Sequence, residues 1–364
     1  MGKRVVVIGM SGGVDSSVAA FLLKKQGYDV RGIFMKNYSD SKNELTGECS
    51  WREEWRMAQK IAFLLKIPIK KVDYEKNYKK EIIEKMYRDY SRGLTPNPDI
   101  LCNKVIKFPF LWNEAKKEKA DFIATGHYAR VRHGKNGFYL LAGIDKNKDQ
   151  SYFLYELNQE HLSHVLFPVG EYKKEEIREI ARGGKFPNWD KKGTRGICFV
   201  GKRDMKLFLK KKIKEKKGKV ILPSGEVIGV HPGSMFFTIG ERAGERNGFE
   251  INRENLGGKI CKLYVAQKKG NTLIVAPEGH STLKRKKIFV KNFHLIDLRE
   301  KVNNKKFNAR IRHLGEMHKG RINRIKGRII FNFVSGVEGV AEGQSVVLYD
   351  GERVVGGGEI RVRQ

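Results

Sequence analysis

Apolar and polar positions along the first 130 residues follow two patterns, one typical of strands and one typical of helices. Short apolar runs such as residues 4–10 (RVVVIGM) predict buried strands, whereas apolar residues recur at helical spacing across residues 50–66. The predicted strands are 4–10, 29–37, 67–73 and 121–128, and the predicted helices are 16–26, 50–66, 75–93 and 106–120. Strands that alternate with helices predict an α/β fold built on a doubly wound parallel sheet.

The pattern changes beyond about residue 205. A basic run that ends at Lys219 is followed by short apolar segments separated by Gly-rich turns, up to the final QSVVLYDGERVVGGGEI. Short strands with such turns predict small β-rich modules, of which the last is a barrel. We therefore expect three domains: an α/β domain over residues 1–205, a central β-rich domain over 206–282 and a C-terminal β-barrel over 283–364.

A loop rich in glycine and serine, SGGVDSS, joins the first strand to the first helix. Gly12 and Gly13 lack a Cβ, so the backbone can approach a phosphate, and the following helix directs unpaired N–H groups toward that anion. Asp15 is placed to hold Mg²⁺. The loop has neither the Gly-Lys-Ser/Thr ending of a P-loop nor the G-x-G-x-x-G of a dinucleotide site. Because ligands bind at the carboxyl ends of parallel strands, we expect this loop, Met35 and Gly126 to line one pocket.

Composition narrows the choice of partner and compartment. The chain has 73 Lys and Arg against 41 Asp and Glu, a formal net charge of +32. A single lysine run is typical of a solvated face, but an excess spread along the chain favours RNA or DNA over a membrane. The sequence has no transmembrane-length apolar stretch, no signal-peptide pattern and no C-x-x-C pair among its four cysteines. We expect a cytoplasmic protein without a membrane partner, in which a cysteine matters for its chemistry.

Several motifs resemble those of known proteins. SGGVDSS is similar to the pyrophosphate-binding loop of the PP-loop ATP pyrophosphatases, which cleave ATP between the α and β phosphates and adenylate an oxygen. Five further motifs follow in order, two of them with cysteines: RGLTPNPDILCNKVIKF (92–108), ATGHYAR (124–130), KDQSYFLY (148–155), LFPVGEYKKEEIR (166–178) and GICFVG (196–201). Together they resemble the MnmA family of tRNA-specific 2-thiouridylases over essentially the whole chain.

The resemblance implies an ATP-dependent tRNA sulfurtransferase. To replace a base carbonyl oxygen by sulfur, the oxygen must become a leaving group and sulfur must arrive as a nucleophile. Adenylation by ATP meets the first need, and a cysteine persulfide meets the second, with another thiol releasing the sulfur by disulfide formation. The resemblance assigns the persulfide to Cys198, the partner nucleophile to Cys102, and a role as general base or substrate contact to Asp99.

The same resemblance implies the substrates and partners. These are ATP with Mg²⁺, the wobble uridine in the anticodon of the tRNAs for Lys, Glu and Gln, and an upstream persulfide sulfur-donor protein. The products are 2-thiouridine, AMP and pyrophosphate. Aromatic side chains are expected to stack on the splayed anticodon base, with no particular residue assigned.

The binding residues come from the matched motifs. The residues expected to bind ATP are Gly9, Met10, Ser11, Gly12, Gly13, Val14, Asp15, Ser16, Met35 and Gly126, with Met35 acting through its backbone. The residues expected to contact tRNA are Asn97, Pro98, Asp99, His127, Lys148, Asp149, Gln150, Arg312, His313 and Gln344.

Other interpretations stay open. Asp99, Cys102 and Cys198 are also a ligand set for an iron–sulfur cluster, although we favour the persulfide. His127 also fits a core histidine, residues 148–150 fit a polar turn, and any cysteine fits a small buried apolar residue. Among other PP-loop enzymes, a 4-thiouridine synthase would be expected to bring a different RNA-binding domain, and a tRNA lysidine synthetase should not need paired thiols. A basic RNA-binding protein with a vestigial loop is disfavoured by the intact SGGVDSS and the two motif cysteines.

Overall fold

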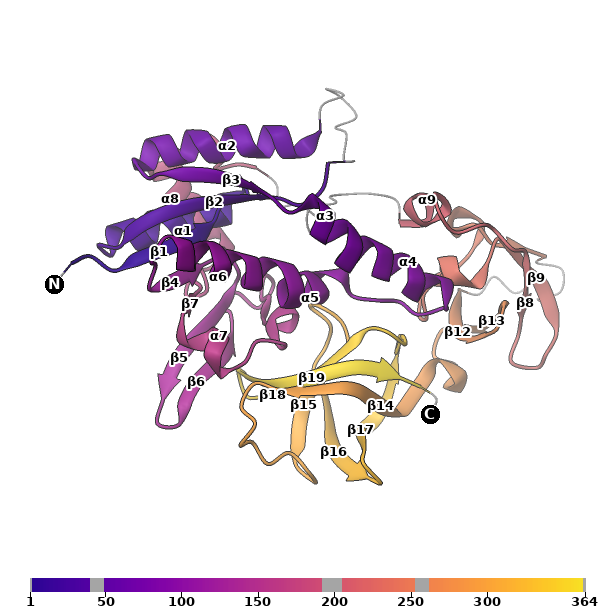
Figure 1. Ribbon diagram of the computed structural model, residues 1–364. Helices are drawn as coiled ribbons and strands as arrows, with labels where there is room; N and C mark the ends of the chain where they lie inside the picture. The colour runs from indigo at the N-terminus through magenta and orange to yellow at the C-terminus, as the bar shows by residue number, and fades with distance from the viewer. Residues whose placement is uncertain (1, 40–48, 192–204, 253–261, 363–364) are drawn as a thin grey trace.

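The computed structural model describes residues 2–39, 49–191, 205–252 and 262–362. Its amino-terminal part contains a five-stranded parallel sheet in the order β3-β2-β1-β4-β7 (Figure 1). The strands are β1 (Val5–Gly9), β2 (Asp29–Lys36), β3 (Ile69–Asp73), β4 (Phe122–Ala124) and β7 (Val165–Leu166). The predicted parallel sheet with alternating helices is confirmed.

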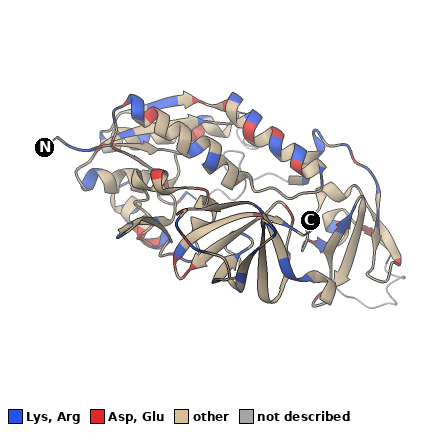
Figure 2. Ribbon diagram, turned by 60° about the horizontal axis from the view of Figure 1, so that its bottom comes forward, with Lys and Arg blue, Asp and Glu red and all other residues tan. Residues whose placement is uncertain are grey.

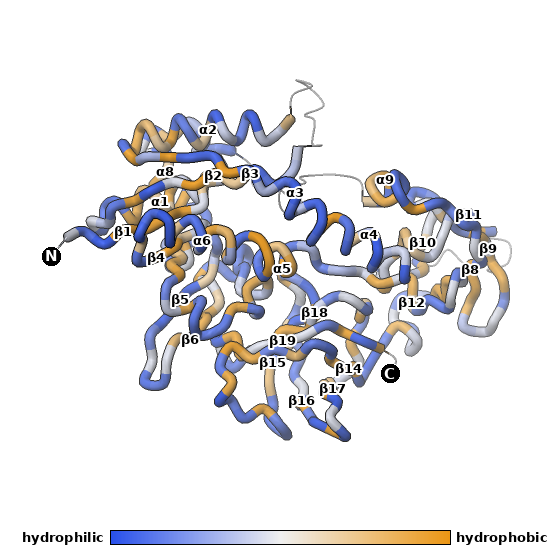
Figure 3. Tube along the Cα trace, in the orientation of Figure 1, coloured by the Kyte–Doolittle hydropathy of each residue, from blue (hydrophilic) through white to orange (hydrophobic). Residues whose placement is uncertain are grey.

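Helices cover both faces of this sheet, because successive residues of a strand point to opposite sides. Val6 and Ile8 of β1 pack in one core with α1 and α2, whereas Val7 packs in a second core with α6. The amphipathic character of α2 is visible as alternating colours along its turns (Figure 3). The helices of this part are α1 (Val14–Lys25), α2 (Ser50–Leu65), α3 (Glu75–Tyr78), α4 (Glu84–Ser91), α5 (Pro98–Cys102), α6 (Phe108–Lys117), α7 (Gln159–Ser163) and α8 (Lys174–Gly183).

The helical run that contains α5 and α6 begins earlier than predicted. It starts at Pro98 rather than at residue 106, and a π-helical segment, Asn103–Lys107, joins its two α-helices. Asn97 caps the run, because its side chain accepts a hydrogen bond from the N–H of Ile100 at 3.2 Å. Pro98 occupies the first helical position, where a missing N–H does no harm. The predicted start of this helix at residue 106 was therefore too late.

The rest of the chain forms two β units (Figure 1). Helix α9 (Met205–Lys210) precedes a central six-stranded sheet in the order β10-β12-β13-β8-β9-β11. Its strands are β8 (Gly218–Ile221), β9 (Val227–His231), β10 (Arg242–Ala243), β11 (Glu250–Ile251), β12 (Leu263–Lys269) and β13 (Thr272–Pro277).

The C-terminal unit is a barrel, as predicted. Strands β14-β17-β16-β15-β18-β19 are neighbours in that order, and the pairing of β14 with β19 closes them. Their bounds are β14 (Lys284–Leu295), β15 (Lys306–Arg310), β16 (His318–Ile325), β17 (Arg328–Glu338), β18 (Ser345–Asp350) and β19 (Arg353–Arg361). A closed barrel leaves no unpaired edge among these strands.

A hairpin from the amino-terminal part extends the barrel sheet. β5 (Ala129–Gly134) and β6 (Gly137–Ala142) pair with each other, and β6 pairs with β19, where Leu141 lies opposite Arg353. This hairpin is therefore shared between the α/β part and the barrel. The domain boundaries expected from the sequence stay predictions.

Candidate active site

The loop after β1 enters α1 through two glycines. Gly12 has a φ of +71°, and a Cβ there would lie 2.4 Å from the carbonyl oxygen of Glu54 in α2, so only glycine fits. Gly13 is the N-cap of α1 and provides no side-chain cap. The first N–H groups of α1 are therefore available to an anion, which the positive end of the helix dipole also favours. ATP binding by residues 9–16 stays a prediction that this geometry supports.

Three polar side chains hold the loop in shape. The hydroxyls of Ser16 and Ser17 donate to the carbonyl of Gly13 at 3.0 and 2.9 Å. Asn188 is buried, and its Nδ2 donates to the carbonyl of Gly12 at 3.1 Å and to Ser17 Oγ at 3.0 Å. Sequence reasoning missed Asn188, because it lies 176 residues after Gly12 and no local pattern marks it.

Two other strand ends border the loop. Gly126 follows β4, and a Cβ on it would lie 2.7 Å from the backbone nitrogen of Ser16, so a side chain here would collide with the first turn of α1. Met35 lies near the end of β2. The N–H of Gly32 and the carbonyl of Lys36 form hydrogen bonds on the β3 side of β2. Because the backbone groups of successive strand residues point to alternate sides, the backbone N–H and carbonyl of Met35 point to the β1 side. The pairing with β1 has already ended at Gly9 there, so these groups lie beyond its last paired residue. Their contacts with ATP stay predictions.

Asp15, in the first turn of α1, is bound by two groups from distant parts of the chain. Its Oδ1 accepts a hydrogen bond from the hydroxyl of Tyr128 at 2.7 Å and lies 2.5 Å from Lys174 Nζ. Burial, and next the Asp15 carboxylate, raise the pKa of Tyr128, so its hydroxyl stays a donor. Lys174 opens α8, and only 9% of its side chain is exposed. The site thus contains a buried cation that sequence reasoning missed, because Lys174 lies 159 residues from Asp15.

The donor set suits Mg²⁺ that arrives with phosphates. Both contacts that the described residues make with Asp15 involve Oδ1, which leaves Oδ2 as the oxygen that would bind a cation. Within the described ranges, no three His, Cys, Asp or Glu side chains are grouped to hold a metal ion by themselves. Mg²⁺ in nucleotide sites takes one or two carboxylates, phosphate oxygens and water. A single Asp15 oxygen fits that arrangement.

His127 lies in the core next to this site, with 8% of its surface exposed. Its Nε2 is 3.2 Å from Lys107 Nζ, and its Nδ1 is 2.7 Å from Thr125 Oγ1. Burial, and next the Lys107 charge, lower the pKa of His127 well below its ordinary value. The ring is therefore neutral, and Lys107 donates to Nε2. The structure places His127 as a core histidine, one of the two interpretations considered, and its tRNA contact stays a prediction.

Cys102 is the last residue of α5, and its side chain is fully covered (0% exposed). Asp99 is half-buried in the first turn of the same helix. The covered thiol must move before it can react with a substrate. Cys198 lies outside the described residues, so the pairing of the two cysteines and the iron–sulfur alternative stay predictions.

The segment that leads into α5 is held by the barrel. Gln344 Nε2 donates to the carbonyls of Thr95 at 3.1 Å and Pro96 at 3.4 Å, and its Oε1 accepts from Asn97 Nδ2 at 3.4 Å. The N–H of Thr95 also donates to the carbonyl of Glu342 at 2.7 Å. Gln344 thus docks the barrel on the cysteine-bearing helix, whereas the tRNA contacts of Gln344, Asn97 and Pro98 stay predictions.

The expected contacts at 148–150 form a folded turn. Asp149 is buried (1% exposed), and its Oδ2 lies 2.5 Å from Arg310 Nη1. Its Oδ1 accepts from two backbone N–H groups at 3.1 and 3.0 Å. Gln150 Oε1 accepts from the N–H of Tyr128 at 3.0 Å. Of the three residues, Lys148 is the one that is exposed and can reach a phosphate directly.

The two carboxyl-terminal contacts expected after β15 differ from each other. Arg312 is exposed, whereas His313 is half-buried. The His313 ring lies 4.2 Å from the Phe153 ring, and burial lowers the pKa of His313 to about 4. Arg312 is therefore the charged member of the pair at neutral pH, and His313 is a neutral ring.

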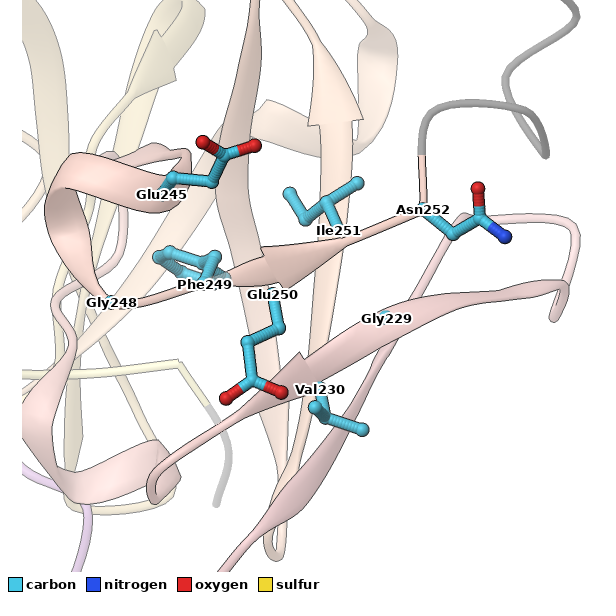
Figure 4. Close-up of a pocket in the computed structure, with 8 residues that line it drawn as sticks. All are labelled: Gly229, Val230, Glu245, Gly248, Phe249, Glu250, Ile251 and Asn252. Atoms are coloured by element: carbon cyan, nitrogen blue, oxygen red, sulfur yellow. The ribbon is translucent and has the colours of Figure 1, made fainter.

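A hollow of about 650 Å³ in the central unit is not part of this site (Figure 4). It is lined by residues of β9, of β11 and of the segment just before β11, at the opposite end of the molecule from β1 (Figure 1). The carboxylates of Glu245 and Glu250 point to opposite sides of the strand, so they do not converge on a ligand.

Comparisons with known proteins identify the family. The domain model described as "tRNA methyl transferase HUP domain" matches residues 3–202, "tRNA methyl transferase PRC-barrel domain" matches 206–277, and "Aminomethyltransferase beta-barrel domain" matches 285–360. The tRNA-specific 2-thiouridylase MnmA of Ralstonia pickettii is 41% identical, over 99% of this chain and 96% of that protein. MnmA 1 of Geobacillus kaustophilus is 40% identical, over 98% of this chain and 95% of that protein. The chain belongs to the MnmA family.

Solved structures add nothing to this assignment. NMN synthetase from Francisella tularensis matches 52% of this chain and 66% of its own, with 16% sequence identity and a TM-score of 0.33, which is too low to support an argument. No helix in the described part of this MnmA-family chain is both long enough and apolar enough to cross a membrane.

Proposed function

We propose that the protein is an ATP-dependent tRNA sulfurtransferase that replaces the C2 oxygen of a uridine by sulfur and so forms 2-thiouridine. The observation that carries this function is the open N-terminus of α1 with the buried Lys174 beside it, in a chain of the MnmA family. A site of this kind binds a polyphosphate, and the family membership supplies the reaction to which the phosphate chemistry belongs.

ATP binds with its phosphates at the loop between β1 and α1. The uridine O2 attacks the α-phosphorus, the bond to the bridging α–β oxygen breaks, and pyrophosphate leaves in the loop. The N–H groups of α1 and the Lys174 ammonium stabilise the negative charge that develops on the phosphates. Mg²⁺, when bound by Asp15 and the phosphates, would neutralise further charge. Because Lys174 comes from α8, the loop itself needs no P-loop lysine.

Sulfur arrives on a cysteine persulfide. The terminal sulfur on Cys198 attacks C2 of the adenylated uridine, and AMP leaves with the former O2. The Cys102 thiolate then attacks Sγ of Cys198. The bond between Sγ and the transferred sulfur breaks, and its electrons go to the sulfur on the base. A disulfide between Cys102 and Cys198 remains. A thiol reductant restores both cysteines. Asp99, in the first turn of the same helix as Cys102, is assigned to base catalysis or substrate contact.

The substrate is the wobble uridine of the tRNAs for Lys, Glu and Gln, and a persulfide sulfur-donor protein supplies the sulfur in the cytoplasm. Lys and Arg residues occur in all three parts of the molecule (Figure 2). A net charge of +32 favours binding to the tRNA backbone through many phosphate contacts. Lys148 and Arg312 are exposed members of the predicted contact set.

The test is product formation in a defined mixture. The purified protein is incubated with ATP, Mg²⁺, a persulfide donor and each tRNA, and 2-thiouridine is measured by mass spectrometry. The wild type and Cys49→Ser should give product, because Cys49 has no assigned role, whereas Cys198→Ser should give none. Asp15→Ala should abolish ATP-dependent pyrophosphate release and keep tRNA affinity. Thiolation by Cys198→Ser would disprove the persulfide assignment, and no product from the wild type would disprove the function.

A further inference from the structure

Two aromatic rings from distant parts of the chain lie against each other at a tilt, near the cysteine-bearing helix. Phe153 belongs to a 3₁₀ turn, Ser151–Leu154, and His313 follows β15. Their ring centroids are 4.2 Å apart, with 35° between the ring planes. Both residues are half-buried, so part of the surface of each stays open to solvent. We name this pair the Phe153–His313 platform.

The platform is fixed relative to Cys102. Asn103, the next residue, is buried, and its Nδ2 donates to the carbonyl of Phe153 at 3.0 Å. On the barrel side, the hydroxyl of Tyr152 donates to the carbonyl of Ser345 at 2.9 Å. These bonds tie the turn that carries Phe153 to both the cysteine-bearing helix and the barrel, so the turn has little freedom to move on its own.

A second tie fixes the His313 side of the platform. The buried ion pair between Asp149 and Arg310 links the loop before the 3₁₀ turn to the last residue of β15. His313 lies three residues after Arg310. Both rings of the platform are therefore held before any substrate arrives, which keeps the entropy cost of using them low.

The His313 ring is uncharged at neutral pH. Its Nδ1 is buried and has no hydrogen-bond partner among the described residues. Burial lowers the pKa of the ring to about 4, the nearby Arg310 also lowers it, and Asp149 opposes both. A neutral ring attracts phosphates weakly, but it offers a flat face to another flat group. Arg312, the preceding residue in the chain, is exposed and supplies a positive charge in the same loop.

We propose that the Phe153–His313 platform is a stacking subsite for an unpaired nucleobase next to the reacting uridine. This inference rests on the proposed function, since it concerns how the RNA loop is held open. The reacting base has to enter the site where the covered Cys102 later attacks Cys198, whereas the platform is half-exposed, so the platform suits a neighbouring base that stays at the surface. RNA loops are held by proteins through this kind of stacking on aromatic and histidine rings.

The experiment uses an anticodon stem-loop with 2-aminopurine next to the wobble uridine. Stacking on the platform should quench 2-aminopurine fluorescence when the wild type binds. Phe153→Leu and His313→Leu remove a ring and keep an apolar side chain, so quenching should be lost and Kd should rise roughly 5- to 100-fold. His313→Phe keeps a neutral ring and should keep the quenching. Phe63→Leu removes a ring that is 85% exposed on α2, outside the platform, and should behave as the wild type.

The outcomes separate this inference from the proposed function. If the wild type makes 2-thiouridine but both leucine variants quench and bind as the wild type does, the platform is wrong and the function stands. If the wild type makes no 2-thiouridine, the function itself fails. Should Phe153→Leu not fold, the comparison of His313→Leu with His313→Phe decides alone: equal quenching by the two variants overturns the proposal.

Discussion

The pair of Asp15 and Lys174 sets the charge of the phosphate site. Asp15 alone would repel the phosphates, but its Oδ1 is neutralised by Lys174 at 2.5 Å and receives the Tyr128 hydroxyl at 2.7 Å. The buried lysine therefore serves two purposes in this account. It balances the carboxylate before ATP binds, and it offers a cation to the phosphates afterwards.

Replacement of Lys174 tests this role. Lys174→Met should slow pyrophosphate release roughly 100-fold, the effect of losing one preorganised group that stabilises charge, and should leave tRNA affinity unchanged. Lys173→Met is the matched control, since Lys173 is its exposed neighbour. Pyrophosphate release is measured at saturating tRNA. An unchanged rate in Lys174→Met would remove Lys174 from the site.

The half-buried, neutral His313 should make the folded state sensitive to acid. Its pKa is lowered to about 4 in the folded protein, mainly by burial, against an ordinary 6.5. As the pH falls below 6.5, the His313 side chain becomes protonated in the unfolded chain but not in the folded chain, so the free energy of unfolding decreases. Between pH 7.5 and 5, the free energy of unfolding of His313→Phe should fall by about 1 kcal/mol less than that of the wild type, with an allowance for partial exposure. Urea titrations at both pH values measure this, and parallel losses would contradict it.

At the scale of elements, the helical run 98–117 has to change before the sulfur can move. Cys102 is fully covered in the resting protein, and a covered thiol reacts slowly with alkylating agents. Iodoacetamide should therefore label Cys102 slowly in the protein alone and faster when tRNA and ATP are bound. Cys49, which is half-buried in another part of the chain, is the internal control and should label equally in both states. Peptide mass spectrometry follows each cysteine, and equal labelling of Cys102 in the two states would contradict a substrate-driven opening.

The elements differ in how far the sequence predicts them, and the differences have physical causes. The loop before α1 was predictable, because the glycines, the strand and the helix that form the cradle are neighbours in the chain. The start of α5 at Pro98 was missed, although Asn97 and Pro98 carry a standard signal for a helix start. Lys174 and Asn188 were not predictable, because only the tertiary fold brings them to the loop.

Roles that depend on burial were also beyond the sequence. The motif at 148–150 predicts either an RNA contact or a polar turn, and only the buried ion pair of Asp149 with Arg310 reveals the turn. Likewise, Gln344 is part of a family motif, but its hydrogen bonds to the segment before α5 appear only when the barrel is in place. The sequence motifs single out Asp149 and Gln344, but they do not reveal the groups that these side chains contact.

At the scale of the whole molecule, all three parts meet at the segment before α5. The N–H of Thr95 donates to the barrel, and its hydroxyl lies 3.4 Å from Thr238 Oγ1 of the central unit. Gly343 of the barrel has a φ of +91°, and a Cβ on it would lie 3.0 Å from the nitrogen and the oxygen of Thr95. The position of the cysteine-bearing helix therefore depends on how the parts dock.

A pair of glycine variants measures this docking. Gly343→Ala combines a left-handed backbone with the contact at Thr95, whereas Gly351→Ala has a φ of +60° and open space around its Cβ. Gly351→Ala is the control and should lose about 1 kcal/mol of unfolding free energy, whereas Gly343→Ala should lose about 2–4 kcal/mol. Gly343→Ala should also form 2-thiouridine more slowly, because the segment before α5 must shift. Equal stability losses and equal rates in the two variants would show that docking does not position the helix.

The central claim is that the oxygen of the base leaves as part of AMP. It is tested most directly with a tRNA whose target uridine carries ¹⁸O at C2, incubated with the protein, ATP, Mg²⁺ and a persulfide donor. Mass spectrometry of the AMP should find one ¹⁸O atom for each 2-thiouridine formed, because O2 attacks the α-phosphorus and departs with it. AMP without the label, alongside thiolated tRNA, would contradict activation of the base by adenylation.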